Sequence, residues 1–207
     1  MTLSNEWRRM QHYKNIGLKF DKVLDIGAFE GIWTQNFKNI YPDADILMIE
    51  ANEEKEQILK NIGPYKIALL GKENNKEVDY YKCLDGMQTG NTIYKENTDF
   101  KFAPVKKTTI TLPTLLNSED GYDLIKMDVQ GSELDIIKGA VPIIKKTTHL
   151  ILETQTLNYN DKAPRLTDIV CYLNTLNFSL IDIIDLHYAL NNTLFQVDVL
   201  FERRIND

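Results

Sequence analysis

Short apolar runs alternate along this chain with segments in which the apolar positions recur every three or four residues. Runs of this length are typical of buried strands, and the second spacing is that of one face of a helix. Five runs predict strands: KVLDIGA, ADILMIE, YKIALL, YDLIKMD and HLILE, which start at residues 22, 44, 65, 122 and 149. The segments around them predict helices over residues 4–17, 31–41, 52–63, 132–139 and 165–176.

Polar residues mark the ends of these predicted helices. Ser4 and Asn52 are expected N-caps, and Ser132 with Asp135 has the spacing of a capping box. After the last helix, FSLIDII and TLFQVDVLF predict two more strands joined by a turn. Residues 71–107 are polar, with EVDYY as one short strand, and CLDGMQTGNTIYKENTD, at residues 83–99, predicts a long loop.

Strands that alternate with helices predict an α/β fold, with a parallel sheet covered by helices on both faces. The chain has 207 residues, of which 43% are hydrophobic and 26% charged, and these values suit one globular domain with a full core. We therefore expect a single domain over residues 1–207. Residues 1–18 form its N-terminal helix, as a lid or a cover on the acceptor side.

The charge and the apolar runs bear on partners and location. The formal net charge of −6 gives no general attraction to phosphate backbones, so nucleic acid is not an expected partner. No apolar run reaches the ~20 residues that span a bilayer, and the N-terminus lacks an apolar signal-peptide core. Cys83 and Cys171 belong to no metal or disulfide motif. These features predict a cytoplasmic protein without membrane insertion.

Acidic residues end four of the five predicted strands: Asp25, Glu50, Asp128 and Glu153. In a parallel sheet, ligands bind outside the carboxyl ends of the strands. The four side chains should therefore meet at one site, although a single acid at a strand end often marks only where the strand leaves the core.

The stretch VLDIGAFEGIW, which starts at residue 23, joins the first strand to its helix through two glycines. Such a turn lets a ligand approach the backbone, and Glu50, about 20 residues further on, stands where an acid binds ribose hydroxyls. The dinucleotide fingerprint requires glycine at position 29, where this chain has Phe29. Asp25 suits an ammonium group better than a pyrophosphate, so the residues favour S-adenosylmethionine over NAD.

At this point the chain resembles a known family. VLDIGAFEG looks like motif I of class I S-adenosylmethionine-dependent methyltransferases, and IEAN resembles their acidic second-strand motif. DLIKMDVQGSELDIIKGA, at residues 123–140, is very similar to the signature of FkbM-type methyltransferases, whose fifth strand LILE matches. The chain departs from the pattern at Gln130, which replaces an acid, and at Pro113, which replaces Asp.

The resemblance covers roughly residues 20–155. It implies a Rossmann-like class I methyltransferase fold, with a mostly parallel seven-stranded sheet and an antiparallel last strand. It also implies the cofactor contacts, from the methionine half through ribose to adenine: Asp25, Gly27, Ala28, Phe29 and Gly31, then Glu50 and Ala51, then Ala68 and Leu69, with Asp128 beside the transferred methyl group.

Methyl transfer to a hydroxyl requires a base, or a metal ion that lowers the hydroxyl pKa. Asp128 and Glu153 are the expected catalytic residues, either as base or as ligands of Mg²⁺ or Mn²⁺, and the sequence leaves this choice open. The expected acceptor contacts are Gln88, Asn91, Gln130, Glu133 and Gln155.

Other polar residues have structural interpretations of equal or greater weight. Glu133 could equally stabilise the N-terminus of its helix, and Lys126 is expected in a structural ion pair. Packing or surface roles are expected for all three histidines: His12; His149, at the wrong end of the sheet; and His187, which could come near the acceptor.

FkbM-type enzymes, as a family, methylate hydroxyls of natural products and of surface sugars. The resemblance therefore implies an O-methyltransferase for a sugar hydroxyl in a glycan or glycoconjugate, working in a larger protein or a glycan pathway. Alternatives are a small natural product or lipid-linked acceptor, and a cofactor- or partner-binding domain without turnover. The loop at residues 84–97 is expected to border the active site and to become ordered when ligands bind.

Overall fold

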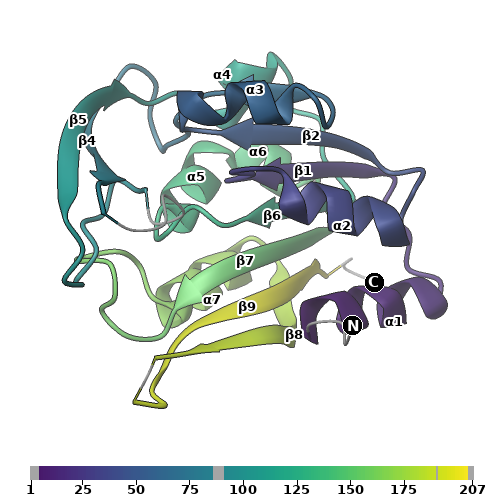
Figure 1. Cartoon of the computed structure of the whole chain (residues 1–207). Helices are drawn as coiled ribbons and strands as arrows, with labels where there is room; N and C mark the ends of the chain where they lie inside the picture. The colour runs from purple at the N-terminus through teal and green to yellow at the C-terminus, as the bar shows by residue number, and fades with distance from the viewer. Residues whose placement is uncertain (1–4, 86–90, 190, 205–207) are drawn as a thin grey trace.

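The computed structural model describes residues 5–85, 91–189 and 191–204. Its centre is a seven-stranded sheet in the order β3-β2-β1-β6-β7-β9-β8 (Figure 1). β9 alone runs in the direction opposite to the other six strands of this sheet, which confirms the predicted mostly parallel sheet with an antiparallel last strand. The strands are β1 (Lys22–Ile26), β2 (Asp45–Glu50), β3 (Tyr65–Ile67), β6 (Leu124–Met127), β7 (His149–Gln155), β8 (Phe178–Tyr188) and β9 (Leu194–Arg203).

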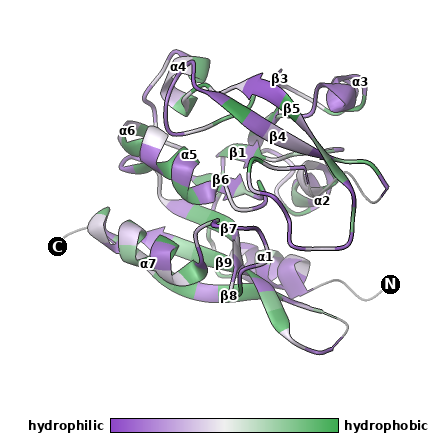
Figure 2. Cartoon of the chain, turned by 90° about the vertical axis from the view of Figure 1, so that its left-hand side faces the viewer, coloured by the Kyte–Doolittle hydropathy of each residue, from purple (hydrophilic) through white to green (hydrophobic). Residues whose placement is uncertain are grey.

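Helices cover both faces of the sheet (Figure 2). One face packs against α1 (Asn5–Asn15) and α2 (Ile32–Ile40), over a buried cluster that includes Phe20 and Phe37. The other face packs against α4 (Leu112–Leu116), α5 (Glu133–Gly139), α6 (Val141–Ile144) and α7 (Leu166–Thr175), over the larger cluster. Because both faces are buried, the central strands read as continuous apolar runs, the pattern from which they were predictable.

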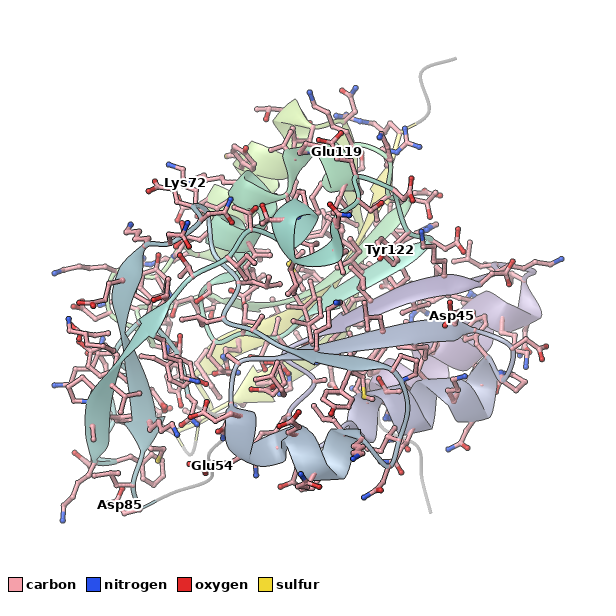
Figure 3. The ribbon with its side chains drawn as sticks, turned by 90° about the horizontal axis from the view of Figure 1, so that it is seen from above. Asp45, Glu54, Lys72, Asp85, Glu119 and Tyr122 are labelled. Atoms are coloured by element: carbon pink, nitrogen blue, oxygen red, sulfur yellow. The ribbon has the colours of Figure 1, made fainter. Side chains whose placement is uncertain are left out.

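A second, two-stranded sheet stands beside the main one. It pairs β4 (Glu77–Cys83) with β5 (Phe102–Thr108) in antiparallel register, where the sequence predicts only the short strand EVDYY. Figure 3 shows this ribbon at one side of the molecule, with Asp85 at its end, far from Asp45 and Tyr122 near the amino ends of β2 and β6. β5 was not identified from the sequence, because Pro104 and two lysines conceal an exposed strand.

Two of the predicted helix caps can be compared with the structure. Asn52 caps the 3₁₀ turn Glu53–Lys55, which leads into α3 (Glu56–Leu59), and its side chain accepts a hydrogen bond from the Glu54 N–H at 3.2 Å. The capping box predicted for Ser132 and Asp135 is wrong, because the Ser132 side chain makes no cap hydrogen bond. The predicted N-cap Ser4 lies outside the described residues. Within the described ranges, no helix combines the length and apolar character needed to cross a bilayer.

The register of the parallel strands sets the position of the site. Ile26 pairs with Ile49 of β2 and with Met127 of β6, and Met127 pairs with Leu152 of β7. The residue after each of these four positions is therefore at the same edge of the sheet: Gly27, Glu50, Asp128 and Glu153. The sequence argument that acids at strand ends meet on one edge agrees with this register.

The turn after β1 is a tight point of this arrangement. Gly27 has φ 79°, and its N–H donates to the carbonyl of Ile49 at 2.9 Å. A β-carbon at this position would lie 1.9 Å from the carbonyl oxygen of Asp128. The ends of β1 and β6 can approach so closely because residue 27 has no side chain.

We expect Gly27→Ala to destabilise the protein by about 2–5 kcal/mol, because the side chain is strained at this φ and forces the Asp128 carbonyl to move. Gly63→Ala is the matched control: Gly63 does not have a left-handed φ, and its nearest neighbour atom would be 4.0 Å away. Urea denaturation of both variants measures the difference. Equal midpoints for Gly27→Ala and Gly63→Ala would contradict the close approach.

Candidate active site

A cavity of about 710 Å³ lies outside the carboxyl ends of β1, β2, β6 and β7. Seven of the ten predicted cofactor contacts line it: Gly27, Phe29, Glu50, Ala51, Ala68, Leu69 and Asp128. Of the predicted acceptor and catalytic residues, Asn91, Gln130 and Glu153 also line it. The structure thus brings most of the predicted set together around one space of ligand size.

Three predicted cofactor residues lie behind the cavity wall instead. Asp25 is fully buried, and its carboxylate accepts a hydrogen bond from the Thr34 hydroxyl at 2.7 Å. Ala28 packs in a small apolar cluster, and Gly31 has φ 70° in a position where a β-carbon would lie 2.5 Å from Ile62. These three residues shape the turn, and their direct contact with a cofactor stays a prediction.

Glu50 connects the ends of β1 and β2. One carboxylate oxygen accepts the Phe29 N–H at 2.7 Å and the other accepts the Asn52 N–H at 2.7 Å. Burial raises the pKa of Glu50, and these backbone hydrogen bonds oppose the rise. A carboxylate offers about four lone-pair sites, so oxygen lone pairs remain available for ribose hydroxyls. The second role of Glu50, in holding the glycine turn, was not foreseen from the sequence.

Lys126 forms the predicted structural ion pair. Its side chain is 9% exposed, and its ammonium nitrogen lies 3.5 Å from a carboxylate oxygen of Asp25 and 3.5 Å from one of Asp128. Burial alone would lower the pKa of Lys126, but the two carboxylates outweigh it and the pKa is raised. Burial likewise opposes ionisation of Asp128, yet Lys126 and neighbouring hydrogen bonds hold the pKa of Asp128 below its ordinary value.

Two glutamine amides connect the neighbouring carboxyl groups of Asp128 and Glu153. Gln130 donates from Nε2 to Asp128 at 2.9 Å and to Glu153 at 2.5 Å, and Gln196 donates to Glu153 at 3.1 Å. Burial, followed by the charges of Asp128 and Asp198, raises the pKa of Glu153 well above its usual range. The pKa values of the pair are therefore shifted in opposite directions, with that of Asp128 lowered and that of Glu153 raised, the pattern expected of two carboxyl groups with different roles in one site.

The far end of the cavity is formed by β8 and β9. His187, Phe195 and Gln196 line it, and His187 Nε2 lies 2.8 Å from Oδ2 of Asp198. This contact raises the pKa of His187, although burial opposes the rise. Sequence reasoning missed Gln196 and Asp198, although two polar residues at alternate positions of an otherwise apolar strand, LFQVDVLF, were a usable signal.

Two predicted acceptor contacts are directed elsewhere. Glu133 is buried and accepts the N–H groups of Val129 at 3.0 Å and Gly131 at 3.3 Å, so it closes the turn before α5. Gln155 is buried too, and it donates to the Ala163 carbonyl at 2.7 Å. Neither residue lines the cavity, because backbone groups of neighbouring loops take up both side chains.

The remaining predictions concern the loop and the histidines. Gln88 lies outside the described residues, as do Gly86 and Gly90, but the described part of the loop borders the cavity through Asn91, Thr92, Ile93 and Glu96. His149 is buried against Phe20 at the amino end of β7, as expected. His12 is exposed on α1. Whether the loop or α1 closes over a ligand stays a prediction.

The family model for the methyltransferase FkbM domain matches residues 25–184. The chain belongs to this family. The match covers most of the chain, and it confirms the resemblance to FkbM-type S-adenosylmethionine-dependent methyltransferases read from residues 123–140. No curated protein matches the chain in sequence.

Solved structures agree with this fold. An FkbM methyltransferase from Methylobacillus flagellatus KT has a TM-score of 0.59 at 18% identity, over 92% of this chain and 46% of its own. An S-adenosylmethionine-dependent methyltransferase from Clostridium acetobutylicum has a TM-score of 0.55 at 12% identity, over 98% of this chain and 92% of its own. The N-terminal domain of EvdMO1, solved in the presence of SAH and D-fucose, has a TM-score of 0.54 at 12% identity, over 99% of this chain and 85% of its own. The chain spans about half the length of the Methylobacillus protein.

The cavity suits S-adenosylmethionine on its own chemistry. The bare backbone at Gly27 allows close approach, and Glu50 keeps oxygen lone pairs for hydroxyls. Ala68 and Leu69 offer apolar surface for a base, and the ionised Asp128 attracts positive charge at the other end. The residues present therefore fit this cofactor.

The raised pKa of Glu133 predicts that the stability of the protein depends on pH. Burial, opposed by its backbone hydrogen bonds, raises the pKa of Glu133 from 4.5 to about 7. The folded protein then binds this proton more tightly than the unfolded chain, so stability falls as pH rises from about 4.5 to about 7. We expect Glu133→Gln to reduce this fall by about 2 kcal/mol. Urea denaturation at pH 5 and pH 8 measures it against Glu119→Gln, an exposed control. An unchanged pH slope in Glu133→Gln would contradict the assignment.

Proposed function

We propose that the protein transfers a methyl group from S-adenosylmethionine to a hydroxyl of a sugar in a glycan or glycoconjugate. The observation that carries the proposal is the acceptor end of the cavity. There, the amides of Gln130 and Gln196 and the carboxyl groups of Asp128 and Glu153 line the same cavity as Phe195. Planar hydrogen-bonding groups next to an aromatic face suit a hydroxyl-rich ring.

The proposed binding mode divides the cavity in two. Glu50 holds the ribose of the cofactor, Ala68 and Leu69 contact its adenine, and the turn at Gly27 accommodates its methionine half. When bound, S-adenosylmethionine supplies an electrophilic methyl group on a sulfonium centre. Asp128 then stands between the two halves, because it follows β6, the strand next to β1 in the middle of the sheet.

The acceptor hydroxyl must lose its proton, and Asp128 is the proposed group that takes it. Its pKa is held low against burial by Lys126, so it is ionised at neutral pH. Glu153, whose pKa is raised well above its usual range by burial and by the charge of Asp128, is not assigned this role. This division of roles narrows the choice that the sequence leaves open between the two acids. A cytoplasmic location, without nucleic acid as a partner, stays a prediction.

Support for a sugar acceptor also comes from one structural neighbour. The N-terminal domain of EvdMO1 shares the fold of this chain, and its structure was determined in the presence of SAH and D-fucose. At 12% identity this likeness concerns the fold alone. It makes D-fucose a reasonable first probe in a screen of monosaccharides and nucleotide sugars.

The cofactor half is tested by calorimetry. We expect SAH to bind with a Kd in the micromolar range, and NAD not to bind. Glu50→Gln should weaken SAH binding by about 1–3 kcal/mol, because one oxygen that would accept a ribose hydroxyl becomes a donor. Glu53→Gln, on a side chain 55% exposed, is the control and should bind SAH normally. Binding of NAD together with no response to SAH would refute the methyltransferase proposal.

The acceptor half is tested with S-adenosylmethionine labelled in its methyl group and the sugar panel. We expect label in an alkali-stable O-methyl ether, and a fall in turnover of at least about 100-fold in Asp128→Asn with little change in SAH affinity. Asp120→Asn, at an exposed loop position, serves as control. Label transferred to amines or carboxyl groups but to no sugar hydroxyl would exclude the proposed acceptor class.

A further inference from the structure

Three neighbouring strands bring a histidine and two acids to one point beside the cavity. Glu153 of β7 is paired in register with Asp198 of β9, and β8, the other neighbour of β9, contributes His187. One potential ligand atom from each residue lies within 4.8 Å of the others. Over residues 5–85, 91–189 and 191–204, this is the one group of three His, Cys, Asp or Glu side chains with such spacing.

The spacing is close to that of a metal site. A cation about 2.1 Å from each ligand holds adjacent ligand atoms about 3 Å apart and opposite ones about 4.2 Å apart. His187 and Asp198 are already 2.8 Å apart, and the full set needs only small side-chain movements. Two carboxylates with one imidazole form a mixed oxygen and nitrogen set, which suits Mn²⁺ better than the oxygen-preferring Mg²⁺.

The charges around Glu153, His187 and Asp198 also favour a bound cation. The ammonium group of Lys126 is engaged by Asp25 and Asp128, at 3.5 Å each, and so does not neutralise Asp198. The carboxyl group of Glu6, in the first turn of α1, feels this excess: its pKa is raised to about 7, first by burial and next by Asp198. The direct partner of Asp198 is the His187 imidazole at 2.8 Å, and a divalent cation bound there would balance the charge of Asp198 in place of a proton on that ring.

The group also has support that orients it. Both Gln130 and Gln196 donate their side-chain amides to the same oxygen of Glu153, which fixes the orientation of that carboxyl group. Hydrogen bonds of this kind to a ligand are a regular feature of metal sites in proteins. The cavity is adjacent, since Glu153 and His187 both line it.

We propose that Glu153, His187 and Asp198 bind a divalent cation, with Mn²⁺ as the preferred ion, at the acceptor end of the cavity. The proposal deepens the proposed function and rests on it in one respect, the nature of the acceptor. Three protein ligands leave coordination positions open on the cavity side. Two neighbouring hydroxyls of a sugar can fill them, so the acceptor class becomes a vicinal diol, and the bound ion lowers the pKa of the hydroxyl that is methylated.

This assignment differs from the ligand pair expected from the sequence, Asp128 with Glu153. Asp128 is paired with Lys126 at 3.5 Å, and a cation beside it would have to displace or face that ammonium group. The partner of Asp198 is instead the His187 imidazole, at 2.8 Å, which can release its proton and bind a metal ion. The proposed ion position therefore lies nearer to β8 and β9 than the position expected from the sequence.

The test is Mn²⁺ binding to the full chain in the presence of SAH, after dialysis against EDTA, followed by electron paramagnetic resonance of the free ion. We expect one Mn²⁺ per chain with a Kd below about 100 μM. Glu153→Gln, His187→Gln and Asp198→Asn should each weaken binding at least about 30-fold. Glu202→Gln, on β9 four residues from Asp198 and with a 53% exposed side chain, is the matched control and should leave the affinity unchanged. No saturable binding, or equal affinity in all four variants, would overturn the proposal.

Two further measurements test whether the ion binds at these three residues. Mn²⁺ should broaden the ring resonances of His187 and leave those of His12 sharp, since only three histidines need to be assigned. Asp128→Asn should lower the affinity much less than Asp198→Asn, and the opposite order would place the ion between Asp128 and Glu153 and overturn the assignment. SAH binding by the same samples separates the two proposals: loss of Mn²⁺ sites with normal SAH binding concerns the cation alone, whereas absence of SAH binding in the unaltered protein refutes the proposed function.

Discussion

The buried ammonium group of Lys126 is the interaction on which the rest of the site depends. It lies between the carboxylates of Asp25 and Asp128, on adjacent strands β1 and β6, and all three groups sit at the carboxyl edge of the sheet. Charges are expensive to bury unless they are paired, and removal of one partner from such a group typically costs about 3–5 kcal/mol. Substitution of any one of the three residues would therefore leave a buried charge unpaired. The ion pairs also fix the ends of β1 and β6 relative to each other.

The consequences of this ion pair spread outward through the cavity. Because Lys126 keeps Asp128 ionised, the charge of Asp128 adds to the effect of burial and raises the pKa of the neighbouring Glu153. Lys126 also lies 5.8 Å from the centroid of the Trp33 ring, and the Trp33 indole N–H donates to Glu6 of α1 at 2.6 Å. The N-terminal helix is thus tied to the electrostatics of the site, although it is more than a hundred residues away in sequence.

Much of this arrangement could be predicted from the sequence, and the residues that could not be predicted are those that non-local strand pairing brings to the site. The acids at positions 25, 50, 128 and 153 follow apolar runs, and parallel register brings the ends of such runs to one edge. The alternation of strands with helices can be read from local patterns, and it is enough to predict a parallel sheet with these strand ends on one edge. His187 and Asp198 reach the site only because β9 returns antiparallel between β7 and β8, a pairing that no local pattern encodes.

Side-chain direction set a second limit on prediction. Gln155 is two residues beyond Glu153 on β7 and so has the same parity, yet the loop at Asn160 folds over it and takes its amide oxygen at 2.8 Å. Glu133 was ambiguous between the helix terminus and the ligand, and two backbone N–H groups decided for the turn. In both cases a buried polar side chain forms hydrogen bonds with nearby backbone groups instead of facing the ligand. The free energy cost of leaving those backbone groups unpaired exceeds that of one lost ligand contact.

The departure of this chain from its family pattern at position 130 fits the same balance of charge. Gln130 stands in the left-handed region at φ 55°, and its amide donates to both Asp128 and Glu153. An acid at this position would accept hydrogen bonds only, and would place a further negative charge against two carboxyl groups and Asp198. The amide instead supplies the donors that allow Asp128 and Glu153 to stand side by side. With Gln196 as second donor, β9 can then bring Asp198 and His187 up to the same cavity without leaving any of these carboxyl groups unpartnered.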